Sequence, residues 1–103
     1  MAWVKLCDEN ELAEGEGKYV KLGEIELAVF LSRGKIYAMD NHCPHAGGAM
    51  SAGYIEGNCA VCPWHGWAFN LHNGELMDAP TVKIATYAVR VVDGIVEAEL
   101  PEN

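Results

Sequence analysis

Two short motifs in the middle of the chain each combine a thiol with an imidazole. The first is Cys43-Pro44-His45 and the second is Cys62-Pro63-Trp64-His65, with sixteen residues between them. Each motif is followed by glycine, so each is expected to lie in a loop. Two such loops facing each other would supply a Cys₂His₂ ligand set for a metal centre.

An iron–sulfur cluster is one centre that suits this mixed ligand set. Thiolates stabilise ferric iron, whereas neutral imidazoles donate less charge and make the iron they hold easier to reduce. Gly47, Gly48 and Gly66 would let backbone N–H groups approach the sulfur atoms and donate hydrogen bonds. Pro44 and Pro63 directly follow the two cysteines and stiffen each loop by fixing φ. These residue types favour a redox centre.

Structural zinc is the main alternative for the same ligands. Zinc fingers pair two cysteines in one half of the site and two histidines in the other. Here each half is mixed, and the first half has a single spacer residue. The spacing argues against zinc, but a zinc-stapled interaction domain with no redox role stays open from the residues alone.

The pattern C-x-H-x₁₆-C-x-x-H, with its prolines and glycines, resembles the Rieske iron–sulfur family. The resemblance extends over nearly the whole chain and implies one [2Fe–2S] cluster. It implies that Cys43 and Cys62 hold an inner, buried iron. It also implies that His45 and His65 hold an outer iron near the surface. A later segment around Pro80 is similar to the family's proline loop, which shields the cluster.

Two departures separate this chain from the high-potential members of that family. Those proteins carry an extra cysteine in each loop, and the two form a disulfide, whereas this chain has Gly48 and Trp64 at those places. They also carry a serine that donates a hydrogen bond to the cluster, where this chain has Trp67. Fewer donors stabilise the reduced state less, so we expect a potential in the lower part of the range of about −150 to +300 mV.

What remains resembles the Rieske ferredoxins of multicomponent oxygenases and the small subunit of NAD(P)H-dependent nitrite reductases. The first resemblance implies an electron carrier, not an enzyme, that takes single electrons from a flavin-dependent reductase to a terminal oxygenase. The second implies a subunit of a nitrite reductase-like complex. Ring-hydroxylating oxygenase large subunits share the Cys-Pro-Trp-His-Gly-Trp string but need a second, larger domain, for which 103 residues leave no room.

Composition limits the partners. The formal charge of −8 argues against nucleic acid and anionic membrane surfaces, and it favours a partner that presents a basic patch. The first residues are charged and no long apolar run follows, so we expect neither a signal peptide nor a membrane span. A cytoplasmic location is therefore expected. There the four cysteines are expected to be metal ligands or buried thiols rather than disulfides.

The elements that position the two motifs are expected to be β-strands. Short apolar runs predict strands over Trp3–Leu6, Lys18–Leu22, Ile25–Leu31, Ile36–Met39, Thr86–Val92 and Ile95–Leu100. Turn residues at 32–35 and the Asp93-Gly94 pair predict two hairpins. No segment keeps a helical period. The expected fold class is all-β, with an antiparallel β sandwich or barrel as its base and an inserted cluster-binding subdomain.

The whole chain, residues 1–103, is expected to form one domain in two parts. Residues 42–77 contain three of the four cysteines, all four histidines and six of the eleven glycines. We therefore assign residues 42–77 to the cluster-binding subdomain, and residues 1–41 and 78–103 to the base.

Several reactive side chains fall outside the four-ligand set. Cys7 and Cys59 are expected to be small buried hydrophobic residues, and strand alternation would point Cys59 away from Cys62. His42 and His72 are expected to face solvent or to lie beside the cluster without binding iron.

The two tryptophans near the second motif receive different interpretations. Trp64 lies between two expected ligands, so it is interpreted either as a docking or shielding residue or as local packing, and both stay open. Trp67 is expected to pack beneath the loop. If the loop tip is the docking face, a transient redox partner would bury it in a small interface.

Overall fold

Antiparallel β-structure dominates this computed structural model, which describes residues 2–44, 48–64 and 66–101. Its strands are β1 (Ala2–Asp8), β2 (Gly17–Leu22), β3 (Ile25–Ser32), β4 (Lys35–Asp40), β5 (Tyr54–Glu56), β6 (Cys59–Val61), β7 (Ala68–Asn70), β8 (Glu75–Leu76), β9 (Ala79–Lys83), β10 (Thr86–Tyr87), β11 (Val89–Val92) and β12 (Ile95–Leu100). Two short 3₁₀ helices, η1 (Glu9–Glu11) and η2 (Met50–Ala52), complete the described elements. The all-β prediction is confirmed.

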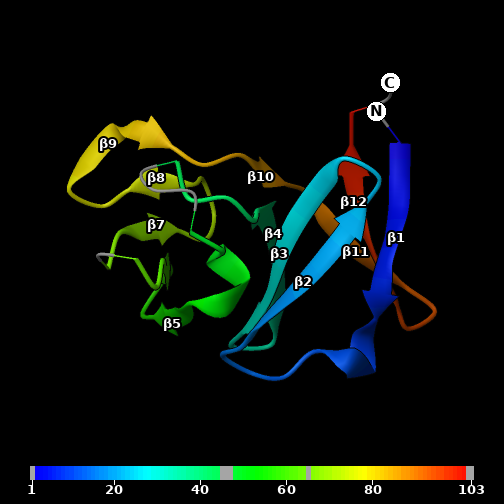
Figure 1. Ribbon diagram of the computed structural model, residues 1–103. Coiled ribbons are helices and arrows are strands. Elements are labelled where there is room, and N and C mark those ends of the chain that lie inside the picture. Colours follow the sequence, from blue (N-terminus) through cyan, green and yellow to red (C-terminus); the bar gives the residue numbers. More distant parts are fainter. Residues whose placement is uncertain (1, 45–47, 65, 102–103) are drawn as a thin grey trace.

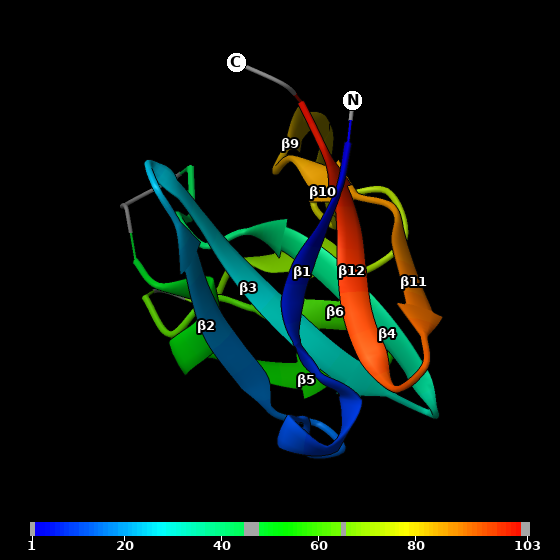
Figure 2. The same cartoon turned by 90° about the vertical axis from the view of Figure 1, so that its right-hand side faces the viewer.

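Three sheets make up the fold, with strand orders β1-β12-β11, β10-β4-β3-β2 and β5-β6-β7-β8-β9. The third sheet lies to one side of the other two in Figure 1. Figure 2 shows the layers face on, with β1 and β12 in front, β3 and β4 behind them, and β5 and β6 at the back. The second sheet therefore stands between the first and the third.

Strand β3 is buried on both faces because it separates two hydrophobic cores. Leu27 and Val29 point into one core and Ala28 and Phe30 into the other, and all four are 0% exposed. A strand covered on both sides needs apolar residues at every position rather than at alternate ones. This explains the nearly continuous apolar run from residue 27 to residue 31.

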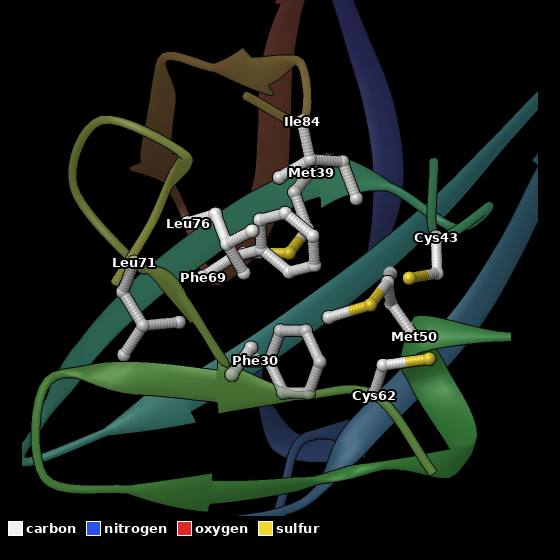
Figure 3. Close-up of a cluster of buried hydrophobic side chains, with 11 residues drawn as sticks. Phe30, Met39, Cys43, Met50, Cys62, Phe69, Leu71, Leu76 and Ile84 are labelled. Atoms are coloured by element: carbon white, nitrogen blue, oxygen red, sulfur yellow. The ribbon is translucent and has the colours of Figure 1, made fainter. Parts of the chain in front are cut away.

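We name the two cores by their positions. The base core lies between the first and second sheets and consists of Leu6, Cys7, Val20, Leu27, Val29, Ala38, Val96, Ala98 and Leu100. The loop-side core lies between the second and third sheets and consists of Ala28, Phe30, Met39, Cys43, Met50, Ala60, Cys62, Phe69, Leu71, Leu76 and Ile84. Figure 3 shows the loop-side core.

Both predicted hairpins are present. Arg33 and Gly34 have φ values of 53° and 78°, and Asp93 and Gly94 have φ values of 52° and 77°. Two consecutive residues with positive φ define the tight turn whose twist matches that of the flanking strands. The turns join β3 to β4 and β11 to β12, each in antiparallel register.

The structure differs from the strand predictions in two places. The predicted strand over residues 86–92 is two strands, because the chain changes sheets: β10 pairs with β4 and β11 pairs with β12. The five short strands of the third sheet were not predicted, since two to five residues are too few to show alternation. The residue bounds of the base and the inserted subdomain stay a prediction. No helix in the described ranges is long and apolar enough to cross a membrane.

Candidate metal centre

The two predicted ligand motifs lie in loops that are built alike. In the first loop, residues 43–48, the backbone N–H of Cys43 donates to the carbonyl of Gly48 at 2.9 Å. In the second loop, residues 62–67, the N–H of Cys62 donates to the carbonyl of Trp67 at 2.8 Å. An antiparallel residue pair lies directly outside each bond, so each loop is closed at its neck. The closures hold the two cysteines at equivalent positions.

Both cysteines of these loops are core residues. Cys43 is 1% exposed and Cys62 is 0% exposed, and their thiols are hydrogen-bonded to each other. Figure 3 shows the two sulfur atoms directed into the same space beside the side chain of Met50. Burial raises the pKa of the Cys62 thiol, while a hydrogen bond from the backbone N–H of Trp64 acts in the opposite direction.

This arrangement fits a soft metal centre. Two sulfur donors from opposite loops converge, both are free of disulfides, and a backbone N–H already points at one of them. A thiolate buried this deeply needs a positive charge beside it, which ferric iron would supply. His45, His65 and Gly47 lie outside the described residues, so the prediction that the two histidines are ligands stays a prediction.

The two loops contact each other through Gly48 and Trp64. Gly48 is buried, and a Cβ atom at this position would lie 2.0 Å from Cδ1 of the Trp64 indole. Trp64 nevertheless remains 58% exposed. One part of its ring therefore packs on the first loop and the rest faces solvent, and a docking or shielding role of Trp64 stays a prediction.

The remaining loop residues differ in exposure. Pro44, Pro63 and Gly66 are exposed, and Gly66 has a φ of 70°, a conformation that favours glycine. Trp67 is half-buried and packs against the loop-side core, with its ring 6.4 Å from the ring of Phe69. The second loop therefore rests on an aromatic pair.

Pro80 lies on β9 and is exposed. Its neighbours Ala79 and Val82 line a groove of about 370 Å³ together with Gly66 and Trp67 of the second loop. The segment around Pro80 thus lies beside the second loop.

The cysteines outside the expected ligand set behave as predicted. Cys7 is 3% exposed within the base core, and Cys59 is 8% exposed on β6. Cys59 lines a surface groove of about 510 Å³, whereas Cys62 belongs to the loop-side core. Burial raises the pKa of both Cys7 and Cys59, which favours the protonated thiol.

The two described histidines are exposed, as expected, and each has a partner. The Nε2 atom of His42 lies 2.9 Å from a carboxylate oxygen of Glu26, and this hydrogen bond raises the pKa of His42. The other oxygen of Glu26 accepts the hydroxyl of Tyr19 at 2.5 Å. His72 stands edge-on to the ring of Tyr37, with 5.1 Å between the ring centroids.

Sequence reasoning missed two features of the site. Met50 is fully buried beside both cysteines, but nothing in its sequence neighbourhood marks it because it lies in the single turn of η2. The chain of hydrogen bonds from Tyr19 through Glu26 to His42 joins three segments, so no local pattern could indicate it.

Comparison with known proteins identifies the family. The model of the Rieske [2Fe-2S] domain matches residues 2–88, a range that contains both loops, the second and third sheets and the loop-side core in full, and the first sheet and the base core in part. The chain therefore belongs to the Rieske [2Fe–2S] domain family, and membership implies a [2Fe–2S] cluster.

Individual relatives differ in how much of their length this chain covers. The ferredoxin component of the naphthalene 1,2-dioxygenase system of Pseudomonas putida is 37% identical over 90 residues, which are 86% of this chain and 86% of that protein. Cholesterol 7-desaturase from Hemicentrotus pulcherrimus is 39% identical over 80 residues, which are 76% of this chain but 17% of the desaturase. The chain thus has the extent of the ferredoxin and spans only a small part of the desaturase.

Solved structures share the fold at similar length. A complex of reduced oxygenase and oxidised ferredoxin in carbazole 1,9a-dioxygenase contains a chain 31% identical to this one, with a TM-score of 0.84 and coverage of 93% and 100% of the two chains. A protein from Mycobacterium tuberculosis described as an NADH-dependent nitrite reductase small subunit is 28% identical, with a TM-score of 0.87 and coverage of 94% and 93%.

Proposed function

We propose that this protein is a one-electron carrier that holds a single [2Fe–2S] cluster on Cys43, His45, Cys62 and His65. The observation that carries the proposal is the meeting of two buried thiols from two loops of the same construction. Each of these loops also contains one of the two histidines. When bound, the cluster would supply one-electron redox chemistry at a mixed thiolate and imidazole site.

Different residues of the chain would have different roles at the site. Cys43 and Cys62 would hold the inner iron from within the loop-side core, and His45 and His65 would hold the outer iron. The backbone N–H of Trp64, which points at the Cys62 sulfur, would stabilise negative charge there. The fully buried side chain of Met50 keeps water from the inner side of the thiols.

The partners follow from the relatives and from the charge. One relative is a ferredoxin component of a dioxygenase system, and one structural neighbour is a ferredoxin in a complex with an oxygenase. We therefore assign this chain the transfer of single electrons from a flavin-dependent reductase to a terminal oxygenase, in the cytoplasm. Its net charge of −8 favours partners with a basic patch over nucleic acid or membranes.

A role as the small subunit of a nitrite reductase-like complex is the second candidate. The likeness to the Mycobacterium tuberculosis protein supports it, since the two chains match over nearly their full lengths. Both candidates carry electrons through the same cluster and differ in the partner. Affinity capture from the native host separates them: a mononuclear-iron oxygenase supports the first candidate, and a nitrite reductase large subunit supports the second.

Metal analysis tests the cluster itself. The purified protein should contain two irons and two acid-labile sulfides per chain, with a red-brown colour. Cys43→Ser, Cys62→Ser, His45→Ala and His65→Ala should each lose most of both. Cys7→Ala and Cys59→Ala are the matched controls and should keep the colour. Zinc in a colourless protein would refute the proposal, as would loss of the cluster in Cys59→Ala alone.

Electron transfer from a purified flavin-dependent reductase tests the carrier role. Attraction between exposed charges is screened over about 8 Å at physiological ionic strength, so the transfer rate should fall steeply as salt is added. Reduction of the cluster that no reductase accelerates would count against an electron carrier. A rate that does not change with salt would show that the acidic surface does not attract the partner.

A further inference from the structure

We infer that Trp64 is a positioning residue that locks the two ligand loops together by packing its indole ring on Gly48. This contact acts where high-potential Rieske proteins have a disulfide, and it serves as a noncovalent equivalent. The inference rests on the proposed function, because it assigns Trp64 a role in retaining the cluster that the two loops would hold.

The geometry of the contact is unusually close. A Cβ atom at position 48 would lie 2.0 Å from Cδ1, 2.9 Å from Cγ and 3.0 Å from Nε1 of Trp64. All three atoms belong to the five-membered part of the indole, so this edge of the ring occupies the space that any side chain at position 48 would need. The contact therefore requires glycine on one side and a ring on the other.

The contact between Trp64 and Gly48 links the two loops, which the backbone hydrogen bonds at the loop necks do not link. The bonds from Cys43 to Gly48 and from Cys62 to Trp67 each close one loop at its own neck. Neither bond links the first loop to the second. Packing of the Trp64 ring on Gly48 supplies such a link on the solvent side of the two thiols, at a residue that is 58% exposed.

A link at this place controls how easily the loops part. A cluster held between two loops is lost when they separate far enough for water or a chelator to reach the iron. If the ring on Gly48 contributes as much as an aromatic pair does, about 0.5–1.5 kcal/mol, its removal should speed cluster release by about 2- to 13-fold. A residue that only covered surface would change release far less.

The test is a double-mutant cycle on the cluster-loaded protein. The rate of cluster loss is followed by visible absorbance in excess bathophenanthroline for wild type, Trp64→Ala, Gly48→Ala and the double variant. Trp64→Ala should lose the cluster about 2- to 13-fold faster than wild type. Gly48→Ala should do so as well, because its methyl group displaces the ring. Once the ring is gone, the three atoms nearest to the methyl group are gone as well, so the double variant should be no faster than Trp64→Ala.

Two further variants separate positioning from general surface cover. Trp64→Phe keeps a ring over Gly48 and should restore much of the wild-type rate. Met77→Ala removes a side chain of similar exposure, 56%, from outside the two loops and should leave the rate unchanged. Visible circular dichroism should change in Trp64→Ala and recover in Trp64→Phe, since this signal reports the geometry around the iron.

The outcomes separate this inference from the proposed function. A wild-type protein that holds no iron–sulfur cluster overturns both. A wild-type cluster that Trp64→Ala releases at the wild-type rate overturns the inference alone, as do effects of the two substitutions that simply multiply in the double variant. If Gly48→Ala does not fold, the comparison of Trp64→Ala with Trp64→Phe and Met77→Ala still decides, because only positioning predicts rescue by the second ring.

Discussion

The two faces of β3 lead into cores of different composition. The base core is built from aliphatic residues and one cysteine, and its strands β1, β2, β3, β4 and β12 are six to eight residues long. The loop-side core contains Phe30, Phe69, Met39, Met50 and the two loop cysteines, and the sheet that closes it has strands of two to five residues. Regular pairing thus dominates one side of the molecule, and large or sulfur-bearing side chains dominate the other.

This difference indicates that the two halves depend on different sources of stability. Long paired strands over an aliphatic core draw their stability from strand pairing and from the burial of apolar surface. Short strands around two buried thiols are incomplete without whatever the thiols bind, because metal binding contributes directly to folding free energy. We therefore expect loss of the cluster to lower the stability of the loop-side core and to change the stability of the base core little.

The largest effect should come from removing the cluster. In Cys43→Ser, amide hydrogen exchange in β6 and β7 should accelerate by about 100-fold or more, because the metal centre no longer holds the loops together. Amides of β1 and β12 should change little. Hydrogen exchange followed by NMR measures both regions in one sample. Equal acceleration in all four strands would show that the two cores fold as one unit.

Cavities on opposite faces of β3 should separate stability from cluster retention. Phe69→Ala in the loop-side core should lower the free energy of unfolding by about 3–5 kcal/mol and should also speed cluster loss. Leu27→Ala in the base core should lower the free energy of unfolding by about 2–5 kcal/mol, while the folded protein keeps its visible spectrum. Denaturant titration and absorbance give the two quantities. If both folded variants lost the cluster at the same rate, the claim that only the loop-side core affects cluster retention would be wrong.

Two glycines with the same backbone conformation offer a smaller comparison. Gly74 and Gly94 have φ values of 76° and 77°, so alanine is strained by about 1–2 kcal/mol at either position. At Gly94 a Cβ atom meets open space, but at Gly74 it would lie 2.1 Å from the carbonyl oxygen of Ile84. Gly74→Ala should therefore cost roughly 1–3 kcal/mol more than Gly94→Ala. Equal unfolding midpoints would mean that the turn before β8 can move away from Ile84.

The smallest effect concerns Tyr19 and Glu26 at the edge of the second sheet. The hydrogen bond to the Glu26 carboxylate raises the pKa of the Tyr19 phenol. A raised pKa means that the stabilisation is complete below the unfolded value of about 10 and is lost as pH rises through the folded value. Glu26→Gln should lower the pKa of Tyr19, measured by ¹³C NMR of labelled tyrosine. Glu24→Gln is the control, and an equal shift there would point to general charge rather than this bond.

The parts of the fold that sequence could predict are those with local causes. Asp93-Gly94 predicts a turn because few residue pairs accept two positive φ values, whereas at 32–35 a glycine and polar residues between two apolar runs predict the other turn. The apolar run over residues 25–31 likewise predicted a strand, because its residue types favour one locally. The change of sheet after β10 depends on the separate partners β4 and β12, which lie far away in the sequence, so no local pattern could indicate it.

The candidate site was predictable in its chemistry and not in its packing. The spacing of Cys43 and Cys62 with their neighbours predicted two facing loops, and the structure brings both thiols together. Met50 and the contact between Gly48 and Trp64 were not predictable, because each depends on how segments distant in sequence meet. Sequence showed that Gly48 and Trp64 stand where other proteins have cysteines, and the structure shows them in contact.

The pairing of β1 with β12 has a consequence for the order of events during synthesis. Ala2 lies opposite Leu100, so the first sheet closes only after residue 100 has left the ribosome. Both ligand loops and all of the third sheet emerge earlier. Contacts between distant segments form slowly because the chain between them must first be ordered. The loops therefore leave the ribosome before the base beneath them is complete.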